Sequence, residues 1–283
     1  MTAYNLIIQG EDVSTPDLKA LYAIAEASAI ERVADQAFRL PNANSAKKNE
    51  VAVHCDAARL DYAFVPAGRK LSEFKLIAMD MDSTVITIEC LDEIADFVGK
   101  KAEVSAITEA AMRGEITDWK ESFRRRVSLL AGLDHSAMER VYDERLKLTP
   151  GAEQLVAAAK KAGIKLVLVS GGFTFFTSRL KARLGFDYEF SNTIEIVDRK
   201  FTGKVLGDLV DGEAKARHVT RVMRELGIAK DQAIAIGDGA NDLRMMSEVG
   251  VGIAFHAKPV VRAQATYALS HVGLDGVVNL FAA

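Results

Sequence analysis

A repeated pattern in the second half of the chain most constrains its fold. Helix-like segments alternate there with short apolar runs, which are "KLVLV" (165–169), "YEFSNTIEIV" (188–197), "AIAI" (233–236) and "VGIAF" (251–255). An earlier run, "KLIAM", covers residues 75–79. Short apolar strands separated by helices are typical of a parallel sheet with helices on both faces. The sequence therefore predicts an α/β fold with a doubly wound, mostly parallel sheet.

A helical insertion interrupts this pattern between about 88 and 146. Apolar residues recur there at helical spacing in two stripes, Leu91-Ile94-Ala95-Val98 and Trp119-Phe123-Val127-Leu130. Because the insertion follows the first strand of the predicted sheet, it can cover the carboxyl ends of the strands. We expect a helical cap over that edge.

The first 72 residues read as a separate small α/β unit. "YNLIIQG" predicts a strand, a helix follows Thr15-Pro16, and "VAVHC" (51–55) predicts another strand. Proline, glycine and charged residues in "VPAGRKLSEF" mark a boundary. The predicted domains are 1–72 and 73–283, with the cap inside the second.

Composition limits the class of partner. The chain of 283 residues has 36 basic against 39 acidic residues and 49% apolar content, without the basic excess of a nucleic-acid-binding protein. The first residues lack the basic segment and the long apolar segment of a secretory signal peptide. No later stretch approaches the ~18 apolar residues of a membrane span. Cys55 and Cys90 lie outside any metal-like spacing. We expect a cytoplasmic protein that acts on a small molecule, with no nucleic acid and no membrane as partner; a homodimer is one option for its assembly.

Two carboxylates, Asp80 and Asp82, follow the run "KLIAM" with only Met81 between them. Alternate side chains of an extended chain share a face, so the two acids can point the same way. A cation or a charged substrate offsets such repulsion, and ligands of open α/β sheets lie at the carboxyl ends of strands. An ordinary acidic turn is the alternative.

Polar residues also follow two later strands. Ser170-Gly171-Gly172 offers a hydroxyl and open backbone N–H groups that suit a phosphate, although two glycines are also common in turns. "GDGAND" (237–242) places Asp238 and Asp242 on one side of a helix start, where they can hold a hard cation or cap the helix. This segment lacks the third glycine of a dinucleotide-binding fingerprint.

Two basic side chains lie on helix faces that are otherwise apolar. Lys215 shares its face with Val219 and Val222. Arg126 is the member of the run Arg124–Arg126 that falls on the apolar face around Phe123. A lysine at the end of an apolar face commonly extends to solvent, whereas an arginine inside such a stripe needs a counter-anion or a route to water.

Taken together, "DMDST" (80–84), "SGG", Lys215 and "GDGAND" resemble the haloacid-dehalogenase superfamily. The insertion resembles the helical-cap subclass that contains the phosphoserine phosphatases, on the segments "IECLDEIA", "AMRGEI" and "RRRVSLL", with "GKVLGD" and "AFHAKP" later in the chain. The resemblance covers about 75–275. Residues 1–72 lie outside it, and relatives often carry a small amino-acid-sensing domain in that position.

The resemblance implies a role for each residue of the core. Asp80 is similar to the nucleophile that forms an aspartyl-phosphate, and Asp82 is similar to the general acid and base. Mg²⁺ would be bound by Asp80, the backbone carbonyl of Asp82 and Asp238, with Asp242 nearby. The residues that match those holding the phosphate or the substrate are Ser170, Gly171, Lys215 and Asn241.

The cap residues imply the substrate. Glu89 matches the residue that binds an ammonium group and Arg126 the residue that binds a carboxylate. Trp119 stands where some relatives have phenylalanine, and Met112 would line the pocket. A zwitterionic amino acid needs one acid and one base at a fixed separation. The expected activity is therefore Mg²⁺-dependent hydrolysis of O-phospho-L-serine, the last step of serine biosynthesis.

Three alternatives stay open. The same chemistry would serve a phosphatase for another small phosphate ester, or a phosphotransferase that uses homoserine as acceptor. If the chain is a serine-sensing binding module, its main function lies in residues 1–72 and the catalytic part is secondary. A phospho-accepting receiver domain would lack the helical insertion.

Overall fold

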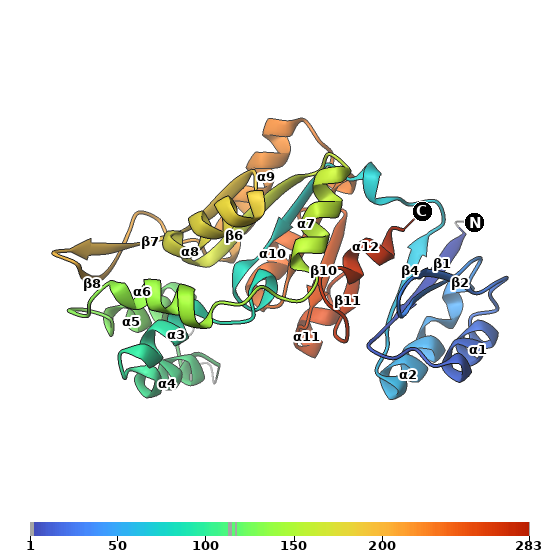
Figure 1. Cartoon of the computed structure of the whole chain (residues 1–283), viewed down its shortest axis with the longest axis horizontal. Helices are drawn as coiled ribbons and strands as arrows, with labels where there is room; N and C mark the ends of the chain where they lie inside the picture. Colours follow the sequence, from blue (N-terminus) through green and yellow to red (C-terminus); the bar gives the residue numbers. More distant parts are fainter. Residues whose placement is uncertain (1–2, 113–114, 117, 283) are drawn as a thin grey trace.

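The computed structural model describes residues 3–112, 115–116 and 118–282 and contains two sheets. A four-stranded sheet has the order β2-β3-β1-β4, and a seven-stranded sheet has the order β11-β10-β9-β5-β6-β7-β8. In Figure 1 the small blue sheet lies at one end of the molecule, and the green helical insertion lies below the larger sheet at the other. No helix in the described part of the chain combines the length and hydropathy needed to cross a bilayer.

The N-terminal unit contains an antiparallel sheet and two helices. Its elements are β1 (Tyr4–Gln9), α1 (Thr15–Ile24), β2 (Glu31–Ala34), β3 (Ala37–Leu40), a short 3-10 turn (Ser45–Lys47), α2 (Lys48–Ala58) and β4 (Asp61–Pro66). The Ser14 side chain accepts a hydrogen bond from the Asp17 N–H and caps α1.

The strand predicted for 51–55 is wrong, because these residues lie inside α2. Val51 and Cys55, one helical turn apart, are fully buried against the sheet, whereas Val53 is 72% exposed. Valine favours strands, but burial of the positions i and i+4 determines the local structure here.

The larger sheet confirms the predicted doubly wound α/β fold. Its parallel strands are β5 (Leu76–Met79), β6 (Lys165–Phe173), β7 (Tyr188–Val197), β9 (Ala233–Gly237), β10 (Val251–Phe255) and β11 (Tyr267–Leu269), and β8 (Lys200–Leu206) adds an antiparallel edge. A short 3-10 turn (Leu71–Glu73) precedes β5. The first strand, β5, lies between β6 and β9, so the chain order reverses at this position.

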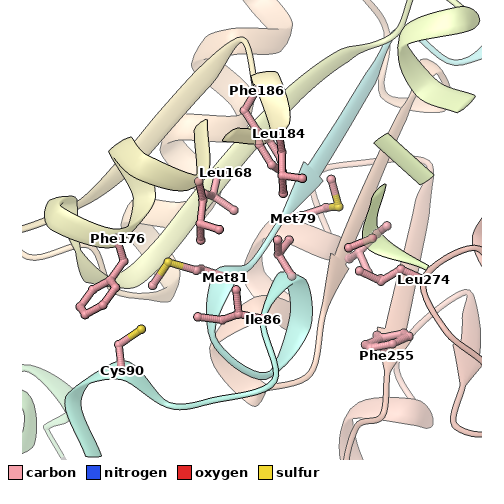
Figure 2. Close-up of a cluster of buried hydrophobic side chains, with 14 of the residues drawn as sticks. Met79, Met81, Ile86, Cys90, Leu168, Phe176, Leu184, Phe186, Phe255 and Leu274 are labelled. Carbon is pink, nitrogen blue, oxygen red and sulfur yellow. The ribbon is translucent and has the colours of Figure 1, made fainter. Parts of the chain in front are cut away.

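Helices cover both faces of this sheet because alternate strand residues point to opposite sides. Ile77 and Met79 belong to the buried cluster that contains residues of α7 (Ala152–Lys161), α8 (Thr174–Leu180) and α12 (Gly276–Leu280). Leu76 and Ala78 belong to a second cluster, with residues of α9 (Gly212–Leu226) and α10 (Leu243–Met246). In the first cluster, Figure 2 shows Met79 and Leu168 from paired strands among Met81, Ile86 and Cys90. A short helix, α11 (Pro259–Arg262), follows β10.

Among the described residues between 88 and 146, the regular elements are helices, and Asp134 in a connection forms an isolated bridge with Lys200. The insertion comprises α3 (Cys90–Phe97), α4 (Lys101–Met112), α5 (Trp119–Ser128), α6 (Ser136–Arg140) and a further helical turn (Val141–Arg145). Both predicted stripes face inward, and Ile94 and Val127 are fully buried. The cap therefore has its own apolar interior, continuous with the core below it.

Candidate active site

A pocket of about 350 Å³ lies at the carboxyl ends of β5, β6 and β9, where ligands bind in folds of this kind. The sheet contributes Asp80, Asp82, Gly171, Gly172, Asp238 and Asn241, and the cap side contributes Glu89, Leu91, Trp119, Phe123 and Arg126. Ser170, Lys215 and Asp242 are fully buried beside it. Met112 ends α4, and its side chain lies outside the described part of the structure. The structure thus brings together the other predicted site residues.

The backbone after β5 stays extended long enough to align the two acids. Asp80 (φ −67°, ψ 162°) and Asp82 (φ −64°, ψ 137°) are extended, and the chain turns at Ser83 (φ 53°). Met81, between them, is fully buried in the apolar cluster (Figure 2). Because side chains alternate along an extended chain, both carboxylates face away from that cluster.

Lys215 neutralises part of the acidic cluster. Its Nζ lies 2.7 Å from an oxygen of Asp80 and 2.7 Å from an oxygen of Asp242, and none of its side chain is exposed. Burial opposes its charge, but the carboxylates of Asp242 and Asp80 raise the pKa of Lys215 overall. The lysine therefore stays charged inside the protein, and it does not extend to solvent.

Three carboxylates remain close together around this lysine. Oxygens of Asp80, Asp238 and Asp242 lie within 4.8 Å of one another. Burial and the carboxylate of Asp242 raise the pKa of Asp80 well above its usual range and that of Asp238 to about 6. The buried Thr84 hydroxyl, 3.4 Å from Asp238 Oδ1, was not predicted as part of the site. Such a cluster of negatively charged oxygens fits a hard divalent cation, whose charge would relieve the repulsion among the three carboxylates.

Asp82 is oriented by the cap. The backbone N–H of Cys90, the first residue of α3, donates to Asp82 Oδ1 at 3.1 Å. Burial raises the pKa of Asp82 to about 6, although hydrogen bonds from the side chain and the backbone N–H of Cys90 lower it. A carboxyl group with such a pKa can both hold and release a proton near neutral pH. The backbone part of this contact does not depend on residue type, and the sequence analysis did not predict the contact.

The carboxyl end of β6, Ser170-Gly171-Gly172, is shaped for close approach. The Ser170 hydroxyl accepts the Gly172 N–H at 2.9 Å. A Cβ atom at Gly172 would lie 2.8 Å from Asp82 Oδ2, so glycine is needed there. The buried Asn192 of β7 donates to the Gly171 carbonyl at 2.7 Å and holds the end of β6 in place. A buried asparagine in an apolar strand is a signal that could have identified this residue.

The cap presents one acid and one base to the pocket. The Ser83 hydroxyl donates to Glu89 Oε1 at 2.6 Å. Desolvation and the nearby Asp82 carboxylate raise the pKa of Glu89 to about 7. The buried Arg126 Nε has no hydrogen-bond partner among the described residues. Burial lowers the pKa of Arg126, although Asp92 and Glu89 attract its charge. A guanidinium with an unpaired Nε is suited to an incoming carboxylate.

Aromatic rings form the wall beside this arginine. Trp119 stacks on Phe123 with ring centroids 5.1 Å apart and an interplanar angle of 8°. A Cβ atom at Gly171 would lie 3.3 Å from the Trp119 ring. The tryptophan of the cap therefore lies directly against the carboxyl end of β6.

Comparison with known proteins gives consistent matches. A family model described as haloacid dehalogenase-like hydrolase matches residues 77–247, and a domain of unknown function (DUF4072) matches residues 6–51. The phosphoserine phosphatase of Polaromonas sp. is 57% identical over 215 residues, which are 75% of this chain and 91% of that protein.

Solved structures match nearly the whole chain. The unliganded probable phosphoserine phosphatase from Vibrio cholerae has a TM-score of 0.86 and 37% identity, and the match covers 99% of this chain and 86% of that one. A HAD family hydrolase from Salmonella enterica serovar Typhi has a TM-score of 0.89 and 32% identity, with 99% and 98% covered.

Proposed function

Because the chain belongs to the haloacid dehalogenase-like hydrolases, we propose that it hydrolyses O-phospho-L-serine to L-serine and phosphate. The observation that carries this proposal is one pocket lined by Glu89 and Arg126, whose Nε has no partner among the described residues, together with the acid pair Asp80 and Asp82. Relatives named phosphoserine phosphatase support the same substrate.

The first step transfers the phosphoryl group to the protein. A carboxylate oxygen of Asp80 forms a bond to phosphorus while the bond between phosphorus and the serine oxygen breaks. Asp82 gives its proton to that oxygen, because a serine alkoxide is a poor leaving group. In the second step Asp82 takes a proton from water, whose oxygen displaces Asp80 from phosphorus. Phosphate is released and both carboxyl groups return to their starting state.

Charge neutralisation makes the first step feasible. A phosphate dianion is repelled by the carboxylates, and Lys215 offsets part of that repulsion. When bound to Asp80, Asp238 and the backbone carbonyl of Asp82, with Asp242 nearby, Mg²⁺ would supply the remaining positive charge. The identity of the metal as Mg²⁺ is part of the proposal.

The remaining residues select the substrate. Ser170, Lys215, Asn241 and the N–H of Gly171 would hold the phosphate oxygens. Glu89 would bind the ammonium group and Arg126 the carboxylate of the serine moiety. Trp119 narrows the pocket around the short side chain, and a lining role for Met112 stays a prediction.

The setting of the reaction is also proposed. We assign it to the last step of serine biosynthesis in the cytoplasm. The division into domains 1–72 and 73–283, an amino-acid-sensing role for the first and a homodimer stay predictions.

Phosphate release from phosphoserine tests the activity directly. We expect turnover with Mg²⁺ and none in excess chelator. Added homoserine should not divert phosphate from water, since diversion would indicate a phosphotransferase. Absence of phosphate release in the Mg²⁺-loaded protein would refute the proposed function.

The roles of the two acids need a substrate whose leaving group requires no proton. Asp80→Asn should not turn over p-nitrophenyl phosphate, whereas Asp82→Asn should release a burst of about one equivalent of phenol and then stall. Mass spectrometry after acid quench should locate the phosphate on Asp80. Steady turnover of Asp82→Asn without a burst would contradict the assignment.

A further inference from the structure

A second cavity, of about 560 Å³, lies between the N-terminal unit and the core. The N-terminal unit contributes the end of β1 and the turn between β2 and β3, including Gln9, Glu11 and Gln36. The core contributes Ser83, His256 and Asp275. The cavity is large enough for a small metabolite. It is separate from the active-site pocket, which has none of these lining residues.

The junction around this cavity is held by buried polar contacts. Gln9 is 1% exposed, donates to the Gly276 carbonyl at 3.2 Å and accepts from Asn279 at 3.0 Å. Asp61, at the start of β4, accepts the backbone N–H groups of Ser270 and His271 at 2.7 and 2.8 Å. The two units are therefore fixed against each other where the cavity forms.

The walls carry negative charge. Among the described lining residues, Glu11, Asp35 and Asp275 are acidic, and none is lysine or arginine. Asp35 pairs with Arg32, whereas Glu11 and Asp275 form no ion pair with any residue that the structure describes. Such a wall attracts a cation. The metal-like cluster found among the described residues is Asp80, Asp238 and Asp242, so these spread-out carboxylates suit a molecule better than an ion.

Three residues that line the cavity have a left-handed backbone. Gln36 (φ 53°), Ser83 (φ 53°) and His256 (φ 46°) adopt the left-handed conformation without being glycine. Residues other than glycine rarely adopt this backbone conformation. Where they do, the surrounding structure maintains it, often at ligand sites. His256 Nε2 lies 2.9 Å from the Val272 carbonyl and is held in place by it.

Ser83 separates this cavity from the active site. It lines the cavity, follows Asp82 directly, and its hydroxyl donates to Glu89 at 2.6 Å. A ligand that competes for the Ser83 hydroxyl would release the carboxylate of Glu89 from its present position. Occupancy of the cavity would then change how the pocket binds its substrate.

We propose that this cavity binds a small organic amine, which contacts Glu11 and Asp275 and acts on the active site through Ser83. The ammonium group of the ligand forms ion pairs with these two carboxylates. The amide and hydroxyl groups of the wall form hydrogen bonds with the other polar groups of the ligand. The proposal of a binding site does not depend on the reaction, whereas the effect on catalysis rests on the proposed function.

Calorimetry with putrescine on the Mg²⁺-loaded full chain tests the site, with 1,4-butanediol as the uncharged probe of similar length. We expect saturable binding of putrescine alone. Glu11→Lys should weaken it about tenfold, since the reversal replaces attraction by repulsion. Asp12→Lys makes the same change at the neighbouring exposed residue outside the cavity and should have little effect. Equal weakening in both variants, or no saturable binding, would overturn the proposal.

Two further arms locate the amine and its effect. Asp275→Lys, on the core side of the cavity, should weaken binding as Glu11→Lys does; an unchanged affinity would place putrescine outside the cavity and refute the site. Saturating putrescine should change the KM for phosphoserine in the wild type but not in Ser83→Ala. The same change in both would exclude the route through Ser83. If phosphoserine is not turned over at all, the proposed function fails while the calorimetry still decides the site.

Discussion

Replacing Lys215 with methionine measures how strongly the fold depends on one buried charge. The ammonium group is completely buried and lies 2.7 Å from both Asp80 and Asp242. Methionine preserves most of the side-chain volume, so the loss of packing should be small. Removing one partner of a buried ion pair typically costs about 3–5 kcal/mol, because an uncompensated charge remains. We expect the free energy of unfolding to fall by about this amount at pH 8 without divalent metal.

The loss should depend on pH. The folded-state pKa of Asp80 is already raised by burial and by Asp242, and removing the lysine raises it further. A carboxyl group with a raised folded-state pKa contributes stability that is present below its unfolded pKa and lost as the pH rises through the folded one. The deficit of Lys215→Met should therefore be smaller at pH 5 than at pH 8.

Urea unfolding followed by circular dichroism in chelator gives both values. Lys230→Met is the matched control, because that lysine is mostly exposed and pairs with Glu248 at the surface, so its effect should stay within about 1 kcal/mol. Asp242→Asn in the Lys215→Met background should recover part of the loss. A deficit below ~1 kcal/mol, or one that is equal at both pH values, would refute this account of the buried charge.

Three further predictions concern the cap and the N-terminal unit. Arg126→Ala should lower kcat/KM for phosphoserine by a factor that corresponds to a loss of about 2–5 kcal/mol in substrate recognition, whereas Arg124→Ala, at an exposed residue, should change it little. Equal losses in kcat/KM would remove the case for Arg126. Glu89→Gln should gain thermal stability relative to the wild type as the pH rises through about 7, because the raised pKa of Glu89 makes the wild type lose stability there; parallel melting curves from pH 5 to 9 would contradict this. Deleting residues 1–72 should preserve turnover but lower the melting temperature, since Ile7 and Val65 are buried in the same cluster as the core; lost turnover in a folded deletion variant would show that the first unit completes the site.

The parts of the site that follow from periodicity were predicted from sequence. The alternation of Asp80, Met81 and Asp82 is enough to orient both acids, since Met81 is apolar and must be buried. The helical spacing around Lys215 and Arg126 identified which basic residues face inward. These features are local, so one segment carries all the information needed.

Features that depend on contacts between distant segments were not predicted. The helix at 51–55 forms because Val51 and Cys55 pack under a sheet whose strands are distant in sequence. The hydrogen bond from Asn192 to Gly171 joins two adjacent strands, and the Cys90 contact joins the cap to Asp82. A sequence pattern shows that a residue is buried or polar, but it does not show which partner the fold brings to it.

The contact from Cys90 to Asp82 has a consequence for how the protein tolerates mutation. The donor is a main-chain group, so no change of side chain at position 90 removes it, apart from proline, which has no N–H. The cysteine side chain also packs in the apolar cluster (Figure 2), and a hydrogen bond between this side chain and Asp82 helps to lower the pKa of the Asp82 carboxyl group. A substitution at residue 90 should therefore keep the backbone hydrogen bond that orients Asp82 but lose the contribution of the cysteine side chain to the pKa of Asp82.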